Sequence, residues 1–251
     1  MKLKDREYQN NKMKSTIKKE NQISFQTEIS ESLANAIRRY TNQIPVLAID
    51  EVEIERNDSA LYDETIAHRI GLIVLKTEKS MNSKTEIKLK LEVNKEGLVY
   101  AEELKGDAKV IYGKTPITSL NKGQEMILTG FAKMGRGEEH SKFSPGVIFY
   151  RNLFNLNIDK DCPKEVIDIC PKRILKSEGG KIIVENSDEC DMCEACADLC
   201  KKQGKDSIKI TPTKDLAITI ESFGQISPEE ILKQSVEILK KDLDEINKKI
   251  K

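Results

Sequence analysis

Hydrophobic and polar positions alternate along much of the chain, and the period of the alternation predicts the elements. Residues 1–12 are polar and show no pattern, so we expect a mobile extension there. A period of two predicts a strand, and a period near 3.6 predicts a helix. In the first third of the chain these periods predict strands over residues 13–29, a helix after an N-cap at Ser30, a strand over 46–55 and a helix over 61–72.

The middle of the chain has the pattern of short strands, and a cysteine-rich segment follows it. Residues 77–157 alternate in short runs separated by glycine and proline, and they include a polar loop at 135–145. Beyond this region the patterns predict a helix over 162–175, strands over 181–184 and 207–210, and a further strand over 216–220. We therefore predict an α+β protein.

The last segment predicts a long amphipathic helix. Ser227 has the position of an N-cap, Pro228 that of the first helical residue, and Glu230 that of the acidic member of a capping box. Apolar residues then recur at alternating intervals of four and three, the heptad spacing of a helix that packs against another helix. They are Leu232, Val236, Leu239, Leu243, Ile246 and Ile250, with Ile231 and Ile238 widening the stripe. The stripe can pack on the protein's own sheet, pair with a helix of another chain, or do both.

All six cysteines are concentrated in one third of the chain. Cys190, Cys193, Cys196 and Cys200 follow a C-x2-C-x2-C-x3-C spacing, which is that of a bacterial-type iron–sulfur site. In that arrangement the fourth cysteine conventionally serves a second cluster, so the first cluster needs a ligand from elsewhere. Cys170, which precedes a proline, supplies it. We therefore expect one iron–sulfur cluster on Cys170, Cys190, Cys193 and Cys196, and four ligands favour [4Fe–4S] over [3Fe–4S].

The motif of a second cluster is incomplete. It would require cysteines at three positions that hold Lys160, Pro163 and Val166. Cys162 and Cys200 remain near the position of the lost cluster, as free thiols or as a disulfide. A zinc site is one alternative for the main group, although zinc sites usually pair two C-x2-4-C units. A disulfide framework is another, but the chain shows no secretory signal.

Charge and composition narrow the class of function. The 42 basic and 42 acidic side chains cancel, whereas nucleic-acid-binding proteins normally carry a basic excess. The chain has no tryptophan and little aromatic content, which argues against a platform for stacking bases. No apolar run has the length of a membrane span, and thiolate ligands suit a reducing compartment. We expect a cytoplasmic protein that binds neither a membrane nor a specific nucleic-acid sequence.

No arrangement of residues predicts catalysis by the chain itself. A Ser/His/Asp constellation, a phosphate-binding loop and a cluster of aspartates for magnesium are all missing from the sequence. His68 follows a helical apolar pattern and is expected to be structural. His140, in the polar loop, has no nucleophile beside it in the sequence and is expected to contact a partner.

Five segments of the chain together carry a resemblance to a known family: Leu33-Ala-Asn-Ala-Ile-Arg-Arg-Tyr40 and residues 44–54, 63–73, 135–140 and 220–230. They resemble the D subunits of archaeal RNA polymerases, a family related to the eukaryotic third-largest subunit and to the N-terminal domain of bacterial alpha. The similarity extends over the chain from Met13 onward. Val74 stands where the family often has proline, and this departure affects only local geometry.

The resemblance implies an architecture and a set of partners. It implies a discontinuous alpha-like dimerisation domain over residues 13–76 and 214–251, an inserted β-rich domain over 77–157, and an inserted ferredoxin-like iron–sulfur domain over 158–213. The apolar stripe of the last helix would pair with the small alpha-like subunit L, and the heterodimer would be the platform for the large catalytic subunits. Arg38 and Arg39 are either solvated surface charges or contacts to a large subunit, and the second is favoured because arginine forms bidentate contacts with carboxylates.

An iron–sulfur electron-transfer protein, or the small subunit of an oxidoreductase, is the alternative function. Only the cysteine segment supports this alternative, and the ligands of a second cluster are missing from it. The polymerase-like segments and the apolar stripe account for the rest of the chain. In the polymerase interpretation the chain is a non-catalytic subunit of a nucleotidyltransferase, and its cluster holds the inserted domain together.

Overall fold

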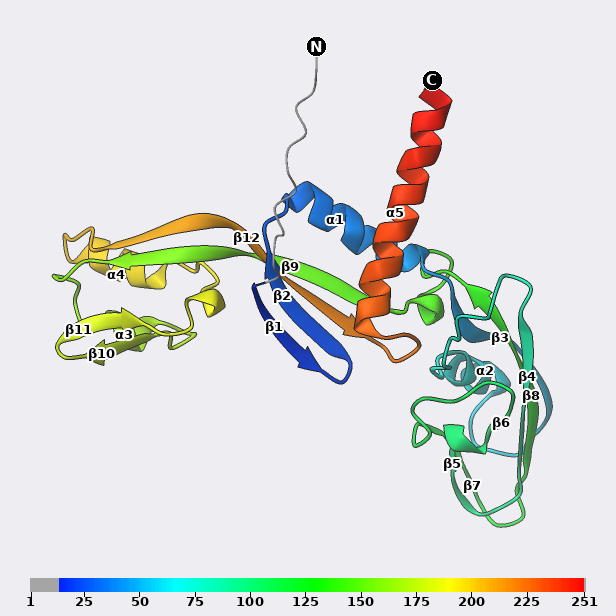
Figure 1. Ribbon diagram of the computed structural model, residues 1–251. Helices are drawn as coiled ribbons and strands as arrows, with labels where there is room; N and C mark the ends of the chain where they lie inside the picture. The colour runs from blue at the N-terminus through cyan, green and yellow to red at the C-terminus, as the bar shows by residue number, and fades with distance from the viewer. Residues whose placement is uncertain (1–13, 251) are drawn as a thin grey trace. The chain divides into compact units, whose positions relative to one another are not determined.

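The computed structural model describes residues 14–250 (Figure 1). The predicted mobile extension over residues 1–12 lies outside them. The described chain forms two compact units, one containing residues 14–17, 24–34 and 149–219, and the other residues 18–23, 35–148 and 220–250. Among the described helices, none is both long and apolar enough to cross a membrane.

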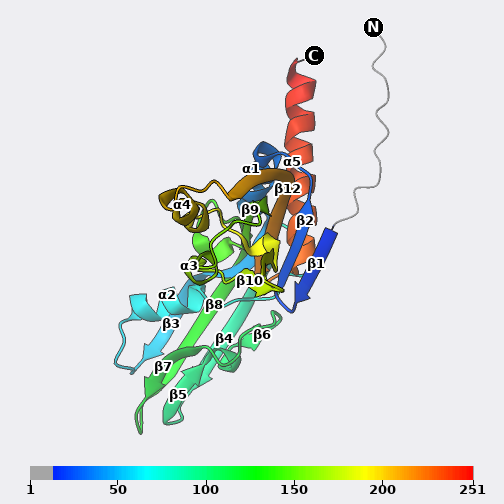
Figure 2. The ribbon, with the colours of Figure 1, turned by 90° about the vertical axis from the view of Figure 1, so that its left-hand side faces the viewer.

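An antiparallel sheet is the centre of the larger unit. Its strands are β3 (Val46–Asn57), β8 (Met126–Gly135), β4 (Glu86–Val93) and the short β6 (Lys105–Gly106), in that order (Figure 2). Strand β8 is central, since Val52 of β3 pairs with Gly130 and Leu89 of β4 pairs with the same residue from the other side. Two register shifts in the β3–β8 ladder mark bulges.

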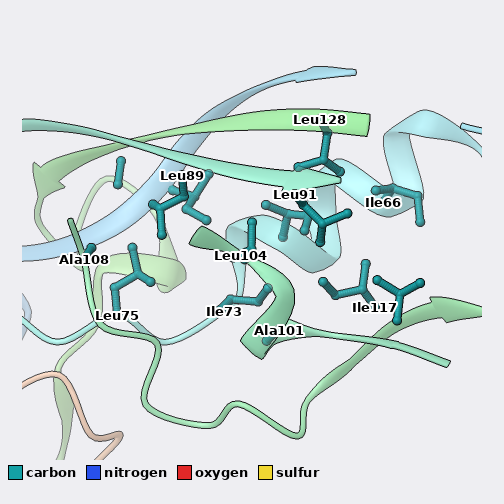
Figure 3. Close-up of a cluster of buried hydrophobic side chains, with 14 of the residues drawn as sticks. Ile66, Ile73, Leu75, Leu89, Leu91, Ala101, Leu104, Ala108, Ile117 and Leu128 are labelled. Atoms are coloured by element: carbon teal, nitrogen blue, oxygen red, sulfur yellow. The ribbon is translucent and has the colours of Figure 1, made fainter. Parts of the chain in front are cut away.

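One hydrophobic core covers a face of this sheet. Helix α2 (Asp63–Gly71) and the two-stranded antiparallel sheet of β5 (Gly97–Tyr100) and β7 (Pro116–Leu120) pack there. Figure 3 shows Leu89 and Leu91 pointing from the sheet toward the segment that carries Leu104. Buried residues of β3 and α2 belong to the same core, among them Leu47, Ile49, Ile66 and Ile70. The core therefore crosses the boundary at residue 76 that the resemblance implied, because β3 pairs with β8 across some eighty residues of sequence.

The predicted helix caps are present. The backbone N–H of Leu33 donates to Ser30 Oγ at 3.2 Å at the start of α1 (Glu31–Tyr40). The N–H of Glu230 donates to Ser227 Oγ at 3.3 Å at the start of α5 (Pro228–Ile250). The second half of the capping box is absent there, since the Glu230 carboxylate accepts from Gln234 Nε2 instead.

The second sheet has the order β1 (Lys14–Lys19), β2 (Gln22–Thr27), β12 (Ile208–Ser222) and β9 (Gly146–Ile158). The division into units falls within these strands. Strand β12 corrects the prediction of two separate strands, at 207–210 and 216–220, because the chain stays extended through Pro212 between them.

The cysteine segment contains short elements. A two-residue turn at Gly179-Gly180, with φ of 57° and 80°, joins β10 (Leu175–Glu178) to β11 (Lys181–Val184) as a hairpin. The predicted helix over 162–175 is wrong in extent. Only α3 (Val166–Ile169) is helical, since Pro163 precedes it and Pro171 follows it. Helix α4 (Ala195–Lys202) carries the last two cysteines.

Candidate subunit interface and cysteine site

Helix α5 divides into a buried first half and an exposed second half. In the first half Ile231 has no exposed surface and Leu239 is 9% exposed. In the second half Leu243, Ile246 and Ile250 are 56%, 53% and 79% exposed. Figures 1 and 2 both show the last turns of α5 projecting beyond the strands of its own unit. The apolar stripe thus leaves three large side chains without apolar cover among the described residues.

Two further members of the predicted stripe, Leu232 and Val236, have solvent exposures between those of the buried and the exposed half. Leu232 is half-buried, and Val236 is exposed. Ser235 lies between them on the inward face, where its Oγ donates to the carbonyl oxygen of Ile231 at 2.8 Å. The face of α5 that packs on its own unit contains Ile231, Ser235 and Leu239. It is therefore rotated from the main line of the predicted stripe, because Ile231 was expected only to widen that stripe.

The first half of α5 packs on the sheet at Gly146. A Cβ atom at this position would lie 2.2 Å from the carbonyl oxygen of Glu221 and 2.9 Å from Cδ1 of Ile231. Real Cβ atoms do not approach backbone atoms so closely, so only glycine allows this contact between strand and helix. The close approach lets the start of α5, at Ile231, pack directly against the backbone of β9.

Arg38 and Arg39 lie on a polar pocket of about 570 Å³. Arg38 Nε and Nη2 both donate to Asn35 Oδ1, at 3.2 and 2.9 Å. The pocket is also lined by Tyr40, Asn42, Gln43, Glu138 and Asp242. Both arginines are exposed, and the guanidinium of Arg38 is oriented by a side chain one turn earlier on the same helix.

A hydrogen bond joins this pocket to α5. The hydroxyl of Tyr40 donates to Asp242 Oδ2 at 3.0 Å. This bond, with burial and the negative charge of Asp242, raises the pKa of Tyr40 above its ordinary value. The sequence patterns did not indicate this pair, because the two residues are 202 positions apart.

The polar loop at 135–145 is fixed to the sheet. Gly135 lies under the ring of Phe143, where a Cβ would come within 2.6 Å of the ring carbons. Lys142 is mostly buried, and its Nζ pairs with Asp50 Oδ1 of β3 at 2.5 Å. His140 is exposed, and its Nδ1 accepts from the backbone N–H of Lys142 at 3.1 Å. His68 is also exposed, so the expected structural role is not one of core packing.

Two lysines flank the carboxylate of Asp50. Burial alone raises its pKa, but hydrogen bonds and charge from Lys133 and Lys142 outweigh burial and hold the pKa of Asp50 below its ordinary value of 3.8. The pair with Lys142 links the loop to β3 and thereby presents Glu138 at the arginine pocket.

The predicted cluster ligands share one hydrophobic cluster in the smaller unit. Cys190 and Cys196 are buried in it, and Cys170 is partly buried against it. Cys193, on the loop between them, is exposed. In residues 14–250, no three His, Cys, Asp or Glu side chains converge closely enough to hold a metal ion. Three of the four predicted ligands therefore lie in or against one hydrophobic cluster and the fourth is exposed, and the four thiols do not converge on a common centre.

The backbone of the cysteine loop is unusual. Among the described residues other than glycine, positive φ angles occur only at Arg173, Asn186, Met192 and Glu194, with values from 52° to 60°. Met192 and Glu194 flank Cys193, and Arg173 follows Cys170-Pro171 closely. Such angles are costly for residues with a Cβ and are typical of sites where the chain wraps a ligand.

The Cys196 thiol has polar partners in the backbone. Burial raises its pKa, as do the nearby thiols of Cys170 and Cys193, whereas the N–H groups of Ala197 and of Cys196 itself act in the opposite direction. The net result is a pKa of Cys196 above its ordinary value. N–H groups directed at a sulfur are a feature that cluster sites use to stabilise thiolate ligands.

The other two cysteines form a close thiol pair. The Sγ atoms of Cys162 and Cys200 are 3.8 Å apart, and both are free thiols. Burial and the hydrogen bond to Cys200 raise the pKa of Cys162 to about 12. The sequence placed these two residues near each other, and the structure brings them into contact.

Similarity to known proteins defines the class of this protein. Residues 52–150 match the family model described as the RNA polymerase Rpb3/RpoA insert domain. This range begins within β3 and ends within β9, so it contains most of the β3–β8–β4–β6 sheet and its core. The protein is thus related to the subunits of multisubunit RNA polymerases.

Full-length relatives then give the family. The chain is 32% identical to the DNA-directed RNA polymerase subunit Rpo3 of Pyrococcus furiosus, over 90% of this chain and 92% of that relative. It is 30% identical to Rpo3 of Archaeoglobus fulgidus over 87% of this chain and 89% of the relative, and 31% identical to Rpo3 of Pyrobaculum calidifontis over 85% and 86%. The chain belongs to the Rpo3 family, the D subunits of archaeal RNA polymerases, and this confirms the resemblance found in the sequence.

Proposed function

We propose that this protein is a non-catalytic assembly subunit of an archaeal DNA-directed RNA polymerase, that it pairs with subunit L through helix α5, and that the pair is the platform for the large catalytic subunits. The observation that carries the proposal is the exposed apolar half of α5. The similarity to Rpo3 of Pyrococcus furiosus covers 92% of that relative, and this extent supports the polymerase role rather than the electron-transfer alternative.

The exposed stripe supports pairing with another helix. Leu243, Ile246 and Ile250 repeat at intervals of three and four, and each is more than half exposed. Transferring one such side chain from water to an apolar interface is worth about 1.5–3 kcal/mol. Three of them in heptad register, on a helix already fixed by its first half, fit the groove of a similar helix.

The arginine pocket supports contact with a large subunit. Arg39 has no ion pair with any described residue, and the guanidinium of Arg38 donates only to the uncharged amide oxygen of Asn35. A carboxylate from another chain would gain two parallel hydrogen bonds from either guanidinium. Asn42 and Gln43 add polar groups to the lining of the same pocket.

The cysteine loop supports one iron–sulfur cluster as a structural cross-link. Cys170, Cys190, Cys193 and Cys196 would hold it, with Cys193 turning inward from its exposed position. The left-handed angles at Met192 and Glu194 and the N–H groups at Cys196 suit a loop that wraps a thiolate site. Such a cluster supplies thiolate–iron bonds between distant segments. Joining Cys170 to Cys190 restricts a loop of about twenty residues, which is worth about 3 kcal/mol in the loop-entropy model.

Paired substitutions on α5 test the docking face. Leu243→Glu with Ile246→Glu puts two charges on the exposed stripe without touching the buried Ile231 or Leu239. Losing two apolar contacts of about 1.5–3 kcal/mol each should lower the affinity for subunit L at least about a hundredfold. Lys241→Glu with Lys248→Glu adds two glutamates to the opposite face of the same helix and is the matched control.

The measurement is co-elution of the full-length chain with subunit L in size-exclusion chromatography. The unsubstituted chain and the Lys241/Lys248 variant should elute as a heterodimer, and the Leu243/Ile246 variant should elute as a separate, folded protein. If the Leu243/Ile246 variant still co-elutes with subunit L, α5 is not the pairing surface.

A further inference from the structure

A second pocket lies in the smaller unit, and none of the predicted cluster ligands lines it. Its volume is about 350 Å³. Three separate pieces of chain meet there: the turn after β9, the start of β11 and the turn after α4. It is lined by Ile158, Asp159, Lys160, Asp161, Cys162, Pro163, Lys164, Gly180, Lys181, Ile182 and Lys205.

The charge of this pocket is opposite to that of its surroundings. Residues 158–207 contain 12 acidic and 9 basic side chains, so the segment as a whole is acidic. The pocket lining contains four lysines and two aspartates and is therefore net positive. The acidic excess of the segment lies elsewhere, mainly around the cysteine loop. The positive charge of the pocket therefore comes from lysines gathered in its lining and does not reflect the average charge of residues 158–207.

Most of these lysines have no internal partner. Lys160, Lys164 and Lys181 form no ion pair or side-chain hydrogen bond with the described residues, whereas Lys176, on the neighbouring β10, pairs with Glu185. Lys205 Nζ donates to the carbonyl oxygen of Asp161 at 2.7 Å, which leaves two of its three donors.

One of the two carboxylates is already engaged. Asp161 Oδ1 accepts from Ser207 Oγ at 3.0 Å, and the backbone N–H of Asp159 donates to the carbonyl oxygen of Ser207 at 2.8 Å. These bonds fix the turn after β9, which carries Lys160 and Lys164, against the start of β12. Ile158, Ile182 and Cys162 provide an apolar part of the lining, which lowers the local dielectric and strengthens charge interactions.

We propose that this pocket binds a compact, multiply charged anion of the phosphate class. Lysine binds phosphate as a point charge, and several ammonium groups from three pieces of chain can surround one such anion. The volume suits a small anion with a few waters rather than a folded partner. This site is independent of the docking face on α5 and of the predicted cluster ligands.

Calorimetric titration of the full-length chain with inorganic pyrophosphate at low salt tests the site. We expect saturable binding with one site per chain. Lys164→Gln with Lys181→Gln should weaken it by roughly tenfold or more, because two of the surrounding charges are removed. The matched control is Lys201→Gln with Lys202→Gln, which removes the same charge from the end of α4 outside the pocket and should bind as the unsubstituted chain does. Far-ultraviolet circular dichroism checks that both variants are folded.

A competition arm separates a compact anion from a nucleic-acid backbone. Pyrophosphate should displace a short oligothymidylate if the oligonucleotide binds there at all. Absence of saturable pyrophosphate binding, an equal loss in both double variants, or oligonucleotide binding that pyrophosphate does not displace would each overturn the proposal. None of these outcomes bears on pairing through α5.

Discussion

Gly146 provides the sharpest test of how the structure positions α5. It begins β9 and lies beneath the first half of the helix, where only a hydrogen atom fits. Gly146→Ala would put a Cβ 2.2 Å from the carbonyl oxygen of Glu221 and 3.0 Å from Cα of Ser222. Both are backbone atoms of β12, so no side-chain rotation can relieve the clash. The backbone conformation of Gly146 is one that alanine adopts, so the effect is purely steric.

The size of the effect follows from these distances. To restore a separation of about 3.0 Å, β9 and β12 must move apart by about 0.8 Å. The hydrogen bond from Phe223 N to Pro145 O, now 3.0 Å, would then exceed hydrogen-bonding distance. Losing one or two such bonds at about 1 kcal/mol each, together with overpacking against Ile231, gives a destabilisation of about 2–4 kcal/mol.

Chemical denaturation followed by circular dichroism measures this change. The control is Gly71→Ala at the end of α2, where the nearest atom to a new Cβ is 3.6 Å away. That variant should be neutral or stabilised by up to about 1 kcal/mol, because alanine lowers the entropy of the unfolded chain. Adding Ile231→Ala to Gly146→Ala should not restore stability, since the clash with the Glu221 oxygen remains. A Gly146→Ala variant as stable as the Gly71→Ala control would refute the packing described for α5.

The remaining predictions concern the cluster, a charged pair and a cap. Cys193→Ser should abolish iron and sulfide content and make residues 158–213 sensitive to protease, while pairing with subunit L persists. Cys162→Ser should retain both iron and sulfide. Equal iron content in the two variants would contradict the ligand assignment. The pKa of Asp50 is lowered in the folded chain, so its contribution to stability is present above about pH 4 and is lost as the pH falls through the folded pKa; Asp50→Asn should remove that part of the acid dependence in denaturation curves. Ser227→Ala should cost about 1 kcal/mol in the same assay, because the N–H of Glu230 loses its acceptor, and Ser227→Asp should restore most of it.

Local patterns predicted the elements that depend on neighbouring residues. The caps at Ser30 and Ser227 need only a side chain and an N–H three residues later, and both are present. Strand β11 has the predicted bounds, because the glycine pair before it defines the turn. The apolar stripe of α5 was also evident, since heptad spacing is a property of the sequence alone.

Features that depend on contacts between distant residues could not be predicted from these local patterns. The pairing of β3 with β8 combines segments that the resemblance had put in different domains, and no local signal marks it. The predicted helix over 162–175 shrank to a single turn because prolines on both sides outweighed the apolar spacing. The division of α5 into a buried and an exposed half was also not predictable, because burial of the first half involves distant parts of the chain, such as Gly146 of β9 beside Ile231. The ligand set of the cluster remains a prediction.

The exposed second half of α5 has a consequence for the lifetime of the free protein. A helix end with Leu243, Ile246 and Ile250 in water frays readily and offers an unfolded, hydrophobic segment. Chaperones and proteases engage segments of this kind, so a chain without its partner should be removed faster than a paired one. If α5 is the pairing surface proposed above, the side chains that drive assembly also make unassembled copies short-lived, and a cell could keep subunit numbers matched without regulating their synthesis.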